Sequence, residues 1–185
     1  MPYSNKPNED DARQRLRAFW AGKSLGRPAL DIPVKNPDFE PRQWPGPEMT
    51  AKQRDLVPEW HAWVHAAESE PHLYYAERFP GHHLAWGSNL MHLSVYAGAD
   101  YQYEDSAWCV HDFDLLDREP PAWDENHWLV RKLDACYDAA KEARGDRGFI
   151  TPPLMVDPLT CLSMIMSPAQ LCMELVDRGP RVREW

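Results

Sequence analysis

Hydrophobic and polar positions alternate along the chain with two different periods, which predict helices separated by short buried strands. Apolar residues recur every three or four positions in four long stretches, as in amphipathic helices: 9–21, 58–67, 124–143 and 159–176. Shorter, more continuous apolar stretches are typical of strands covered on both faces: 28–34, 83–86 and 149–156. This order of strands and helices predicts a parallel α/β fold.

The remaining patterned segments are short. The spacing of their apolar residues predicts short helices over 72–79 and 90–97, the second of them closed by Gly98. Residues 100–104 and 107–113 alternate between polar and apolar or aromatic side chains, which predicts two short strands.

Capping residues mark where the helices begin. Asn8 precedes a run of acidic residues and is expected to cap the first helix. Thr50 and Gln53 have the spacing of a capping box. Ser167 is expected to cap the last helix, which has proline at its first position, and Gln170 is expected to complete a second box.

The helical spacing also predicts which side chains face the protein interior. The expected inward residues are Ala12, Leu16, Phe19 and Trp20 in the first helix; Trp128, Leu129, Leu133, Cys136 and Ala140 in 124–143; and Leu171, Leu175 and Val176 in the last helix.

Length and composition narrow the class of protein. A chain of 185 residues suits one domain, and we expect a single domain over 1–185 with a loose tail at 1–8. The net charge of −9 argues against nucleic acid or an anionic membrane surface as a partner. No apolar run approaches the about 20 residues that a membrane span needs, and the first residues carry no leader pattern. We therefore expect a cytoplasmic protein with four reduced cysteines.

Histidines and cysteines occur at some spacings that metal sites also use. His61 and His65 are one helical turn apart, but the glutamate of the metalloprotease motif is missing, so packing or solvated histidines are favoured over a ligand pair. No CxxC pair supports a structural zinc site. A further hypothesis is a metal-binding module with the ligands His82, His83, Cys109 and His111.

The stretch 82–108 contains the most promising site. Its leading strand ends in the polar turn Gly87-Ser88-Asn89, followed by a helix. Ligands of parallel α/β folds bind at the carboxyl ends of strands, so Ser88 and Asn89 are the first candidate site residues. The alternative role of Asn89 is to cap the helix that follows.

Four segments resemble the N-terminal half of the uroporphyrinogen decarboxylase (URO-D) superfamily, specifically its distant members with a URO-D domain. The segments are 15–22 with 27–30, 84–89 with 97–100, 149–166, and 167–182. They resemble the first three barrel strands of the family and the helices next to them. The resemblance implies an α/β fold of the parallel-strand TIM-barrel type, incomplete in this chain, with about three of the eight strand–helix units.

The resemblance also implies the site residues. Asn89 and Ser88 are the implied catalytic residues. Asn89 stands where the decarboxylase has an aspartate, and an amide cannot carry the negative charge that stabilises a protonated pyrrole intermediate. Lys35, Asn36 and Trp86 are the implied substrate-binding residues, and Lys35 stands where family enzymes have an arginine-rich motif.

By resemblance, the expected function is decarboxylation or corrinoid-linked methyl transfer on a small molecule such as a tetrapyrrole or a methyl donor. No metal or cofactor is assigned to this half, because the zinc ligands of the methyltransferases lie in later strands; zinc or a corrinoid would bind only with the missing half supplied. The domain is expected to be inactive alone or to depend on a second chain, as a homodimer or with a complementary chain. The alternative is a non-catalytic truncated paralogue that self-associates through open sheet edges.

Overall fold

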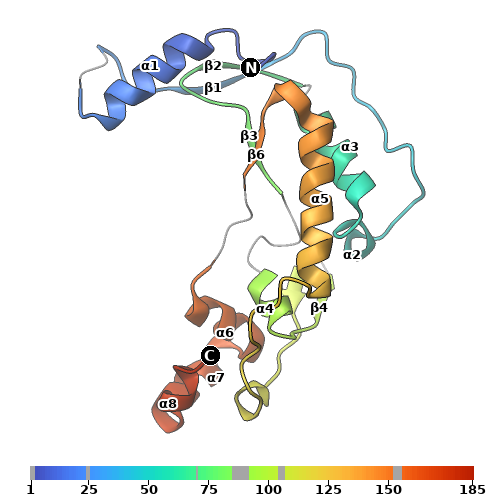
Figure 1. Ribbon diagram of the computed structural model, residues 1–185, viewed down its shortest axis with the longest axis vertical. Helices are drawn as coiled ribbons and strands as arrows, with labels where there is room; N and C mark the ends of the chain where they lie inside the picture. The colour runs from blue at the N-terminus through green and yellow to red at the C-terminus, as the bar shows by residue number, and fades with distance from the viewer. Residues whose placement is uncertain (1–2, 24–25, 70, 85–91, 104–106, 152–155) are drawn as a thin grey trace. The chain divides into compact units, whose positions relative to one another are not determined.

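The computed structural model describes residues 3–23, 26–69, 71–84, 92–103, 107–151 and 156–185 (Figure 1). The chain divides into two compact units, each made of segments that are far apart in the sequence. The first unit is Met1–Pro47, Pro58–Leu84 and Cys136–Thr151, and the second is Glu48–Val57, Ala85–Ala135 and Pro152–Trp185.

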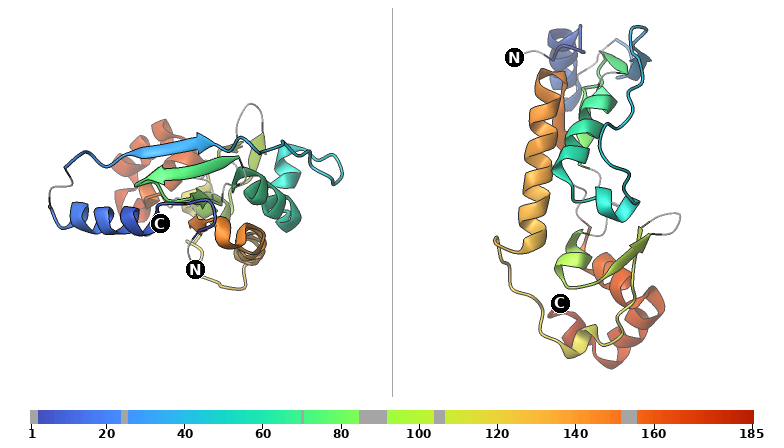
Figure 2. Two further views of the ribbon diagram at one scale, coloured as in Figure 1. Left: turned by 90° about the horizontal axis from the view of Figure 1, so that it is seen from above. Right: turned by 90° about the vertical axis from the view of Figure 1, so that its right-hand side faces the viewer.

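Among its described residues, the first unit contains two small sheets and three helical segments. Its helices are α1 (Glu9–Trp20), α3 (Pro58–Ser69) and the C-terminal part of α5 (Trp128–Arg144), which is followed by a 3₁₀ turn, η2 (Gly145–Arg147). Its strands are β1 (Asp31–Lys35), β2 (His72–Ala76), β3 (Gly81–His83) and β6 (Phe149–Thr151). β1 pairs with β2 in antiparallel orientation, as the opposed arrows in Figure 2 show, and β3 pairs with β6 in parallel.

The prediction of a short helix over 72–79 is wrong, because β2 forms there. Ile32 lies opposite Tyr75 and Val34 lies opposite Leu73 in the ladder with β1. Tyr74 is 2 % exposed and Tyr75 is 40 % exposed, so burial alternates with the period of a strand. Hydrogen bonds with β1 stabilise the extended conformation of this segment, and the spacing of apolar residues within 72–79 does not reveal that pairing.

The parallel pair β3–β6 contains parts of two predicted strands. The predicted strand 83–86 shares only His83 with β3, and its residues 85 and 86 lie outside the described residues. β6 forms the first three residues of the predicted strand 149–156. Its hydrophobic cluster combines strand and helix residues: Leu84, Cys136, Ala140 and Ile150. The prediction that Cys136 and Ala140 face inward is confirmed. Gly148, with φ +154°, lets the chain enter β6 directly beside the Pro80 carbonyl.

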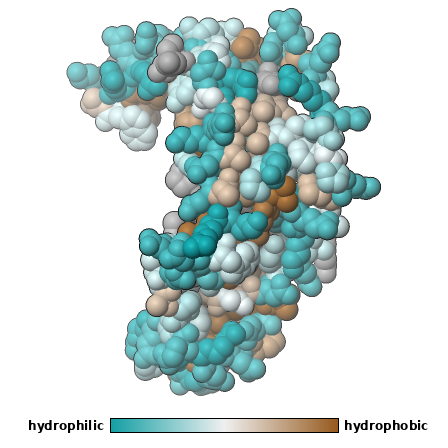
Figure 3. All heavy atoms as spheres, turned by 45° about the vertical axis from the view of Figure 1, so that its right-hand side comes forward, coloured by the Kyte–Doolittle hydropathy of each residue, from teal (hydrophilic) through white to brown (hydrophobic). Residues whose placement is uncertain are grey.

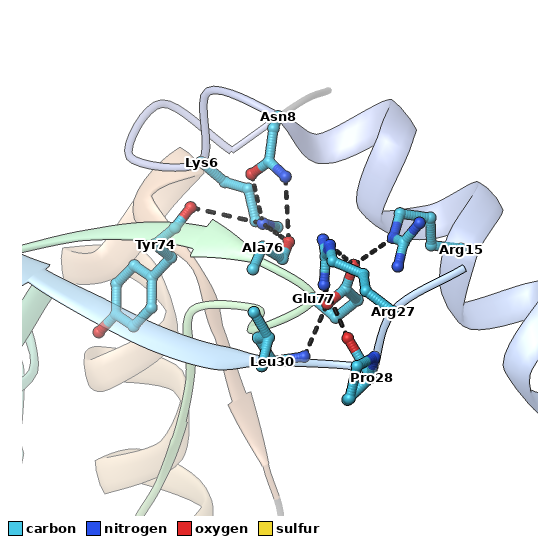
Figure 4. Close-up of polar contacts among 9 residues, drawn as sticks. All are labelled: Lys6, Asn8, Arg15, Arg27, Pro28, Leu30, Tyr74, Ala76 and Glu77. Carbon is cyan, nitrogen blue, oxygen red and sulfur yellow. Dashed lines mark hydrogen bonds and ion pairs between the residues drawn. The ribbon is translucent and has the colours of Figure 1, made fainter. Parts of the chain in front are cut away.

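The N-terminal residues, expected to be a loose tail, are held against β2. The Asn5 carbonyl accepts a hydrogen bond from the Tyr74 amide at 2.9 Å, and Asn5 and Lys6 are buried. The Lys6 ammonium donates to the Asn8 side chain at 2.9 Å, the Ala76 carbonyl at 2.9 Å and the Tyr74 carbonyl at 3.4 Å (Figure 4). Polar backbone groups at the outer edge of β2 make this attachment favourable, although the segment itself is polar.

Asn8 precedes α1 as predicted, but its side chain makes no capping hydrogen bond to the helix. Its amide nitrogen donates instead to the Ala76 carbonyl at 3.1 Å. The sheet therefore uses the polar group that the helix start was expected to use.

The second unit is mostly helical. Its helices are α2 (Ala51–Arg54), α4 (His92–Tyr96), the N-terminal part of α5, α6 (Pro158–Met166), α7 (Pro168–Asp177) and α8 (Gly179–Val182), with the 3₁₀ turn η1 (Leu115–Asp117). The predicted pair of short strands is confirmed as the antiparallel hairpin β4 (Tyr101–Tyr103) and β5 (Ala107–Cys109). One hydrophobic cluster of this unit contains Leu115, Leu116, Leu162, Ile165 and Met166, and another contains Val95, Tyr101, Ala107 and Leu129.

The helix starts follow local sequence closely. The capping box of Thr50 and Gln53 is present in both directions before α2. Ser167 adopts φ +77° and its hydroxyl accepts from the Gln170 amide at 3.3 Å, as expected of a cap. The second box is not completed, because the Gln170 side chain donates to Glu174.

Some of the predicted inward faces are wrong. The exposed exceptions are Phe19, Trp20, Trp128, Leu175 and Val176. In α1 the buried residues are Glu9 and Ala12, and in α7 they are Leu171 and Glu174. Helical spacing defines a wide apolar face, whereas only part of it is covered. Hydrophobic residues are accordingly visible at the surface between mostly hydrophilic ones (Figure 3).

Within the described residues, no single helix is long and apolar enough to cross a membrane. The adjacent helices α6 and α7 reach the required length and composition only together, and a bend of 111° separates them.

Candidate functional site

The strongest sequence candidates, Trp86, Ser88 and Asn89, lie outside the described residues. Lys35 is exposed at the end of β1, opposite His72. Asn36 follows it; its amide donates to the Pro71 carbonyl at 2.8 Å and its side-chain oxygen accepts from the Asp38 amide at 3.1 Å. These contacts give Asn36 a role in the turn that leaves β1.

A hollow of about 510 Å³ lies along this turn. Its lining residues are Asn36, Asp38, Phe39, Glu40, Pro41 and Arg42. All of them belong to one continuous segment after β1, and Lys35 is not among them. The structure therefore brings one of the two expected substrate-binding residues of this region, Asn36, to a concave surface.

The carboxyl ends of β3 and β6 form a second polar location. The Thr151 hydroxyl lies 2.6 Å from Nδ1 of His83 and 3.2 Å from the His82 carbonyl oxygen. The hydroxyl has one proton to donate, and the carbonyl can only accept. Both contacts are satisfied when Thr151 donates to His82 and accepts from the protonated Nδ1 of His83, which leaves Nε2 of His83 with the free lone pair.

His82 and His83 point to different surroundings because successive strand residues face opposite sides of a sheet. Nε2 of His82 lies 2.9 Å from the Tyr74 hydroxyl, whereas the His83 side chain is exposed. The two histidines of the metal-module hypothesis therefore do not converge. Among the described residues, no three His, Cys, Asp or Glu side chains are grouped so that they could hold a metal ion.

His61 and His65 are both buried in the first unit, on α3. Their rings are stacked with centroids 6.2 Å apart, and the His65 carbonyl accepts from Arg144 at 3.4 Å. Trp60 and Trp63 of the same helix pack against Trp44, with ring centroids 5.2 and 5.7 Å from it. The packing interpretation of the two histidines agrees with this arrangement.

A buried carboxylate in the first unit, that of Glu77, forms a cluster with two arginines that was not predicted from the sequence. Glu77, 3 % exposed, accepts from Nη2 of Arg27 at 2.8 Å, from the Leu30 amide at 2.7 Å and from Nε of Arg15 at 2.5 Å (Figure 4). Hydrogen bonds from Arg27, Leu30 and Arg15 lower the pKa of Glu77 to about 2, although burial acts in the opposite direction. The carboxylate links α1, the segment before β1 and the end of β2, which is a structural role.

Lys6 lies beside this cluster, and its ammonium group donates hydrogen bonds to three oxygen atoms. Burial lowers its pKa, and the nearby carboxylate of Glu77 acts against that shift. All the protons of its ammonium group have acceptors in the three hydrogen bonds already described. The lysine therefore joins the N-terminal segment to β2.

The four cysteines are free thiols. Cys136 and Cys161 are buried, Cys109 is half-buried and Cys172 is exposed. Burial raises the pKa of Cys109 and of Cys161, which keeps both thiols protonated and weakly nucleophilic near neutral pH.

Comparison of the chain with protein-family models, curated proteins and solved structures found no match in any of the three.

Proposed function

We propose that the chain is part of an α/β enzyme of the URO-D type, and that its ligand binds at the carboxyl ends of β3 and β6. The parallel pairing of these strands supports this proposal most directly. β6 lies in the segment that resembles the third barrel strand of the family, and β3 ends directly before the segment 84–89 that resembles the second. Ligands of parallel α/β folds bind at such strand ends. Trp86, Ser88 and Asn89 follow β3 in the sequence; Ser88 and Asn89 remain the proposed catalytic residues and Trp86 a proposed substrate-binding residue. Lys35, at the end of β1, and Asn36, directly after it, are the other proposed substrate-binding residues.

His83 supplies a chemical group at this location. Its Nε2 lone pair can accept a hydrogen bond or a proton from a ligand, while Thr151 fixes the orientation of the ring. By resemblance the reaction is decarboxylation or corrinoid-linked methyl transfer. The proposal includes a second chain, identical or complementary, that supplies the rest of the site, and any zinc or corrinoid would bind with that chain present.

The first test measures ligand binding with two probes, uroporphyrin and hydroxocobalamin, by absorbance titration. His83→Ala is expected to weaken binding of one probe by about tenfold, since a hydrogen bond to a charged group contributes about 1.5 kcal/mol. Thr151→Val should weaken binding less, because the imidazole remains but is no longer oriented. His111→Ala is the matched control, an exposed histidine of the second unit, and should bind as the unchanged chain does.

An equal loss of binding in the His83 and His111 variants would contradict the proposed site. If the chain forms a homodimer and neither probe binds to it, an identical second chain does not complete the site. The expected location is the cytoplasm, where four free thiols would stay reduced.

The second candidate function is self-association by a non-catalytic chain, and an exposed apolar sheet face favours it. One face of the β1–β2 sheet carries Leu30, Ile32, Val34 and Tyr75, each between 39 % and 41 % exposed. Among the described strands, only β1 and β2 belong to this sheet. Because the pair is antiparallel, the backbone groups of Asp31, Pro33 and Lys35 point away from β2, to the outer edge of β1. Pro33 removes the central donor of that edge, so the face is the better contact surface.

Light scattering tests this candidate. The chain is expected to have the mass of a dimer, and Ile32→Lys is expected to shift it to a monomer, because a buried ammonium would be left without a partner. Val110→Lys, at 42 % exposure in the second unit, is the matched control and should stay dimeric. A monomeric unchanged chain with a single sharp melting transition would overturn the candidate and would agree with the expected single domain.

A further inference from the structure

Four aromatic rings of the second unit form a continuous group, here called the aromatic platform: Tyr96, Trp123, His127 and Trp128. The two tryptophans are exposed, and Tyr96 and His127 are half-buried. Trp123 stacks on Tyr96 with ring centroids 5.3 Å apart and planes inclined by 22°. His127 lies 4.6 Å from Tyr96 and 5.7 Å from Trp128. Trp123 is 72 % exposed and Trp128 is 52 % exposed. One face of the Trp123 indole is therefore supported and much of the ring is left to solvent.

The platform is fixed by hydrogen bonds on both sides of Trp123. The Tyr96 hydroxyl donates to the Ala122 carbonyl at 2.9 Å and accepts from the Asp124 amide at 2.6 Å. Nδ1 of His127 accepts from the Leu129 amide at 3.3 Å, at the start of α5. The exposed rings thus keep their position before any ligand arrives, which reduces the entropic cost of binding.

Two carboxylates next to the platform have no cationic partner among the residues that the structure describes. Asp124 and Glu125 are exposed, and within the described residues neither makes an ion pair, although Asp124 accepts a hydrogen bond from the Asn126 amide at 2.9 Å. Arg131, one turn into α5, donates to the Asn126 side chain at 2.7 Å. Other acidic residues of the same unit are paired with arginines: Asp112 with Arg118, Asp117 with Arg178 and Glu119 with Arg181.

We propose that the aromatic platform binds an arginine or lysine side chain from a basic segment of another protein. A cation held over an indole face is attracted by the ring quadrupole, and Trp is the strongest such acceptor. Asp124 and Glu125 add attraction for the same charge, and the net charge of −9 favours approach of a basic segment. Neutral ligands such as sugars also stack on exposed tryptophan and can donate hydroxyl hydrogen bonds to carboxylates, but they gain no attraction between opposite charges from Asp124 and Glu125. This surface is independent of the site proposed at β3 and β6.

The experiment uses the full chain and a fluorescently labelled peptide with two arginines separated by glycines, measured by anisotropy. Trp123→Ala is expected to weaken binding about two- to fivefold, the range of one cation–π contact at an exposed site. Trp123→Phe should recover part of the loss, because it restores an aromatic face. The double change Asp124→Asn with Glu125→Gln should weaken binding about fivefold and reduce its dependence on salt.

Trp20→Ala is the matched control, because Trp20 is 81 % exposed and contacts Phe19 edge-on in the first unit. It should leave peptide affinity unchanged. Equal loss in the Trp20 and Trp123 variants would show non-specific attraction and overturn the proposal. Tighter binding of the same peptide with glutamines in place of arginines, or of cellohexaose, would overturn it in favour of a neutral ligand. A thermal melt that is the same for both tryptophan variants would exclude unfolding as the cause of a loss.

Discussion

Alanine at position 148 is expected to destabilise the chain by about 2–4 kcal/mol. Gly148 has φ +154°, a backbone conformation that side chains disfavour. A methyl group there would fall on the Pro80 carbonyl oxygen and on the Arg144 guanidinium, both of which adjoin the entry to β6. Urea denaturation followed by circular dichroism measures the change in the free energy of unfolding.

Gly145→Ala is the matched control for this prediction. Gly145 also has a positive φ, +55°, but no atom lies within 4 Å of the position that its Cβ would occupy. Its substitution should cost only the backbone strain, about 1 kcal/mol. Equal effects of the two substitutions would mean that the close approach between Gly148 and Pro80 does not constrain the β3–β6 pair.

Replacing Glu77 by glutamine is expected to cost about 3 kcal/mol of stability. The variant removes the negative charge that lies between Arg15 and Arg27 and presents a side-chain NH₂ group where two guanidinium groups already donate. Asp31→Asn is the control, because Asp31 pairs with Arg78 at the surface, and its loss should cost about 0.5 kcal/mol. The measurement is again the free energy of unfolding in urea at neutral pH.

Acidification gives an independent check on the role of Glu77. Its pKa is about 2 in the folded chain and 4.5 in the unfolded chain, so the ionised carboxylate stabilises the fold at every pH above 4.5. That contribution is present above pH 4.5 and is lost as the pH falls from 4.5 towards 2. The stability difference between the unchanged chain and the Glu77→Gln variant should therefore shrink over this range. A difference that stayed constant with pH would contradict the assignment.

The features that the sequence predicted correctly depend on neighbouring residues. Thr50 and Gln53 form their capping box within a single turn, and Ser167 caps α7 through an amide three positions away. The hairpin β4–β5 likewise joins segments that are close in the sequence. Local hydrogen bonds of this kind depend little on the rest of the fold, so residue type and spacing are sufficient to find them.

The features that were missed depend on distant segments. β2 is a strand because β1 pairs with it, and Lys6 is buried because the outer edge of β2 offers it carbonyl oxygens. The Glu77 cluster joins arginines that come from two earlier parts of the chain. In α7, Glu174 is buried through its bonds to Gln170 and Arg178, and Val176 is left exposed instead. Charge pairing can thus bury a polar side chain that hydrophobic spacing would place outside.

The candidate site could be predicted only in part. The sequence placed the site at strand ends because ligands of parallel sheets bind there. Among the described strands, β3 and β6 form the one parallel pair. His83 and Thr151 could not be selected from the sequence, because they are 68 positions apart and their contact depends on the pairing of β3 with β6. The aromatic platform was equally hidden, since Trp128 was assigned to the interior by its helical spacing.

The attachment of the N-terminal residues has a consequence for proteolysis and truncation. Asn5 and Lys6 occupy the backbone amide and carbonyl of Tyr74 at the outer edge of β2. A chain cut after Asn8 would expose this edge of a strand whose centre reads Leu73-Tyr74-Tyr75, a composition that favours cross-β stacking. The first few residues therefore cover an edge that could otherwise pair with another chain, and their removal is expected to increase self-association at β2.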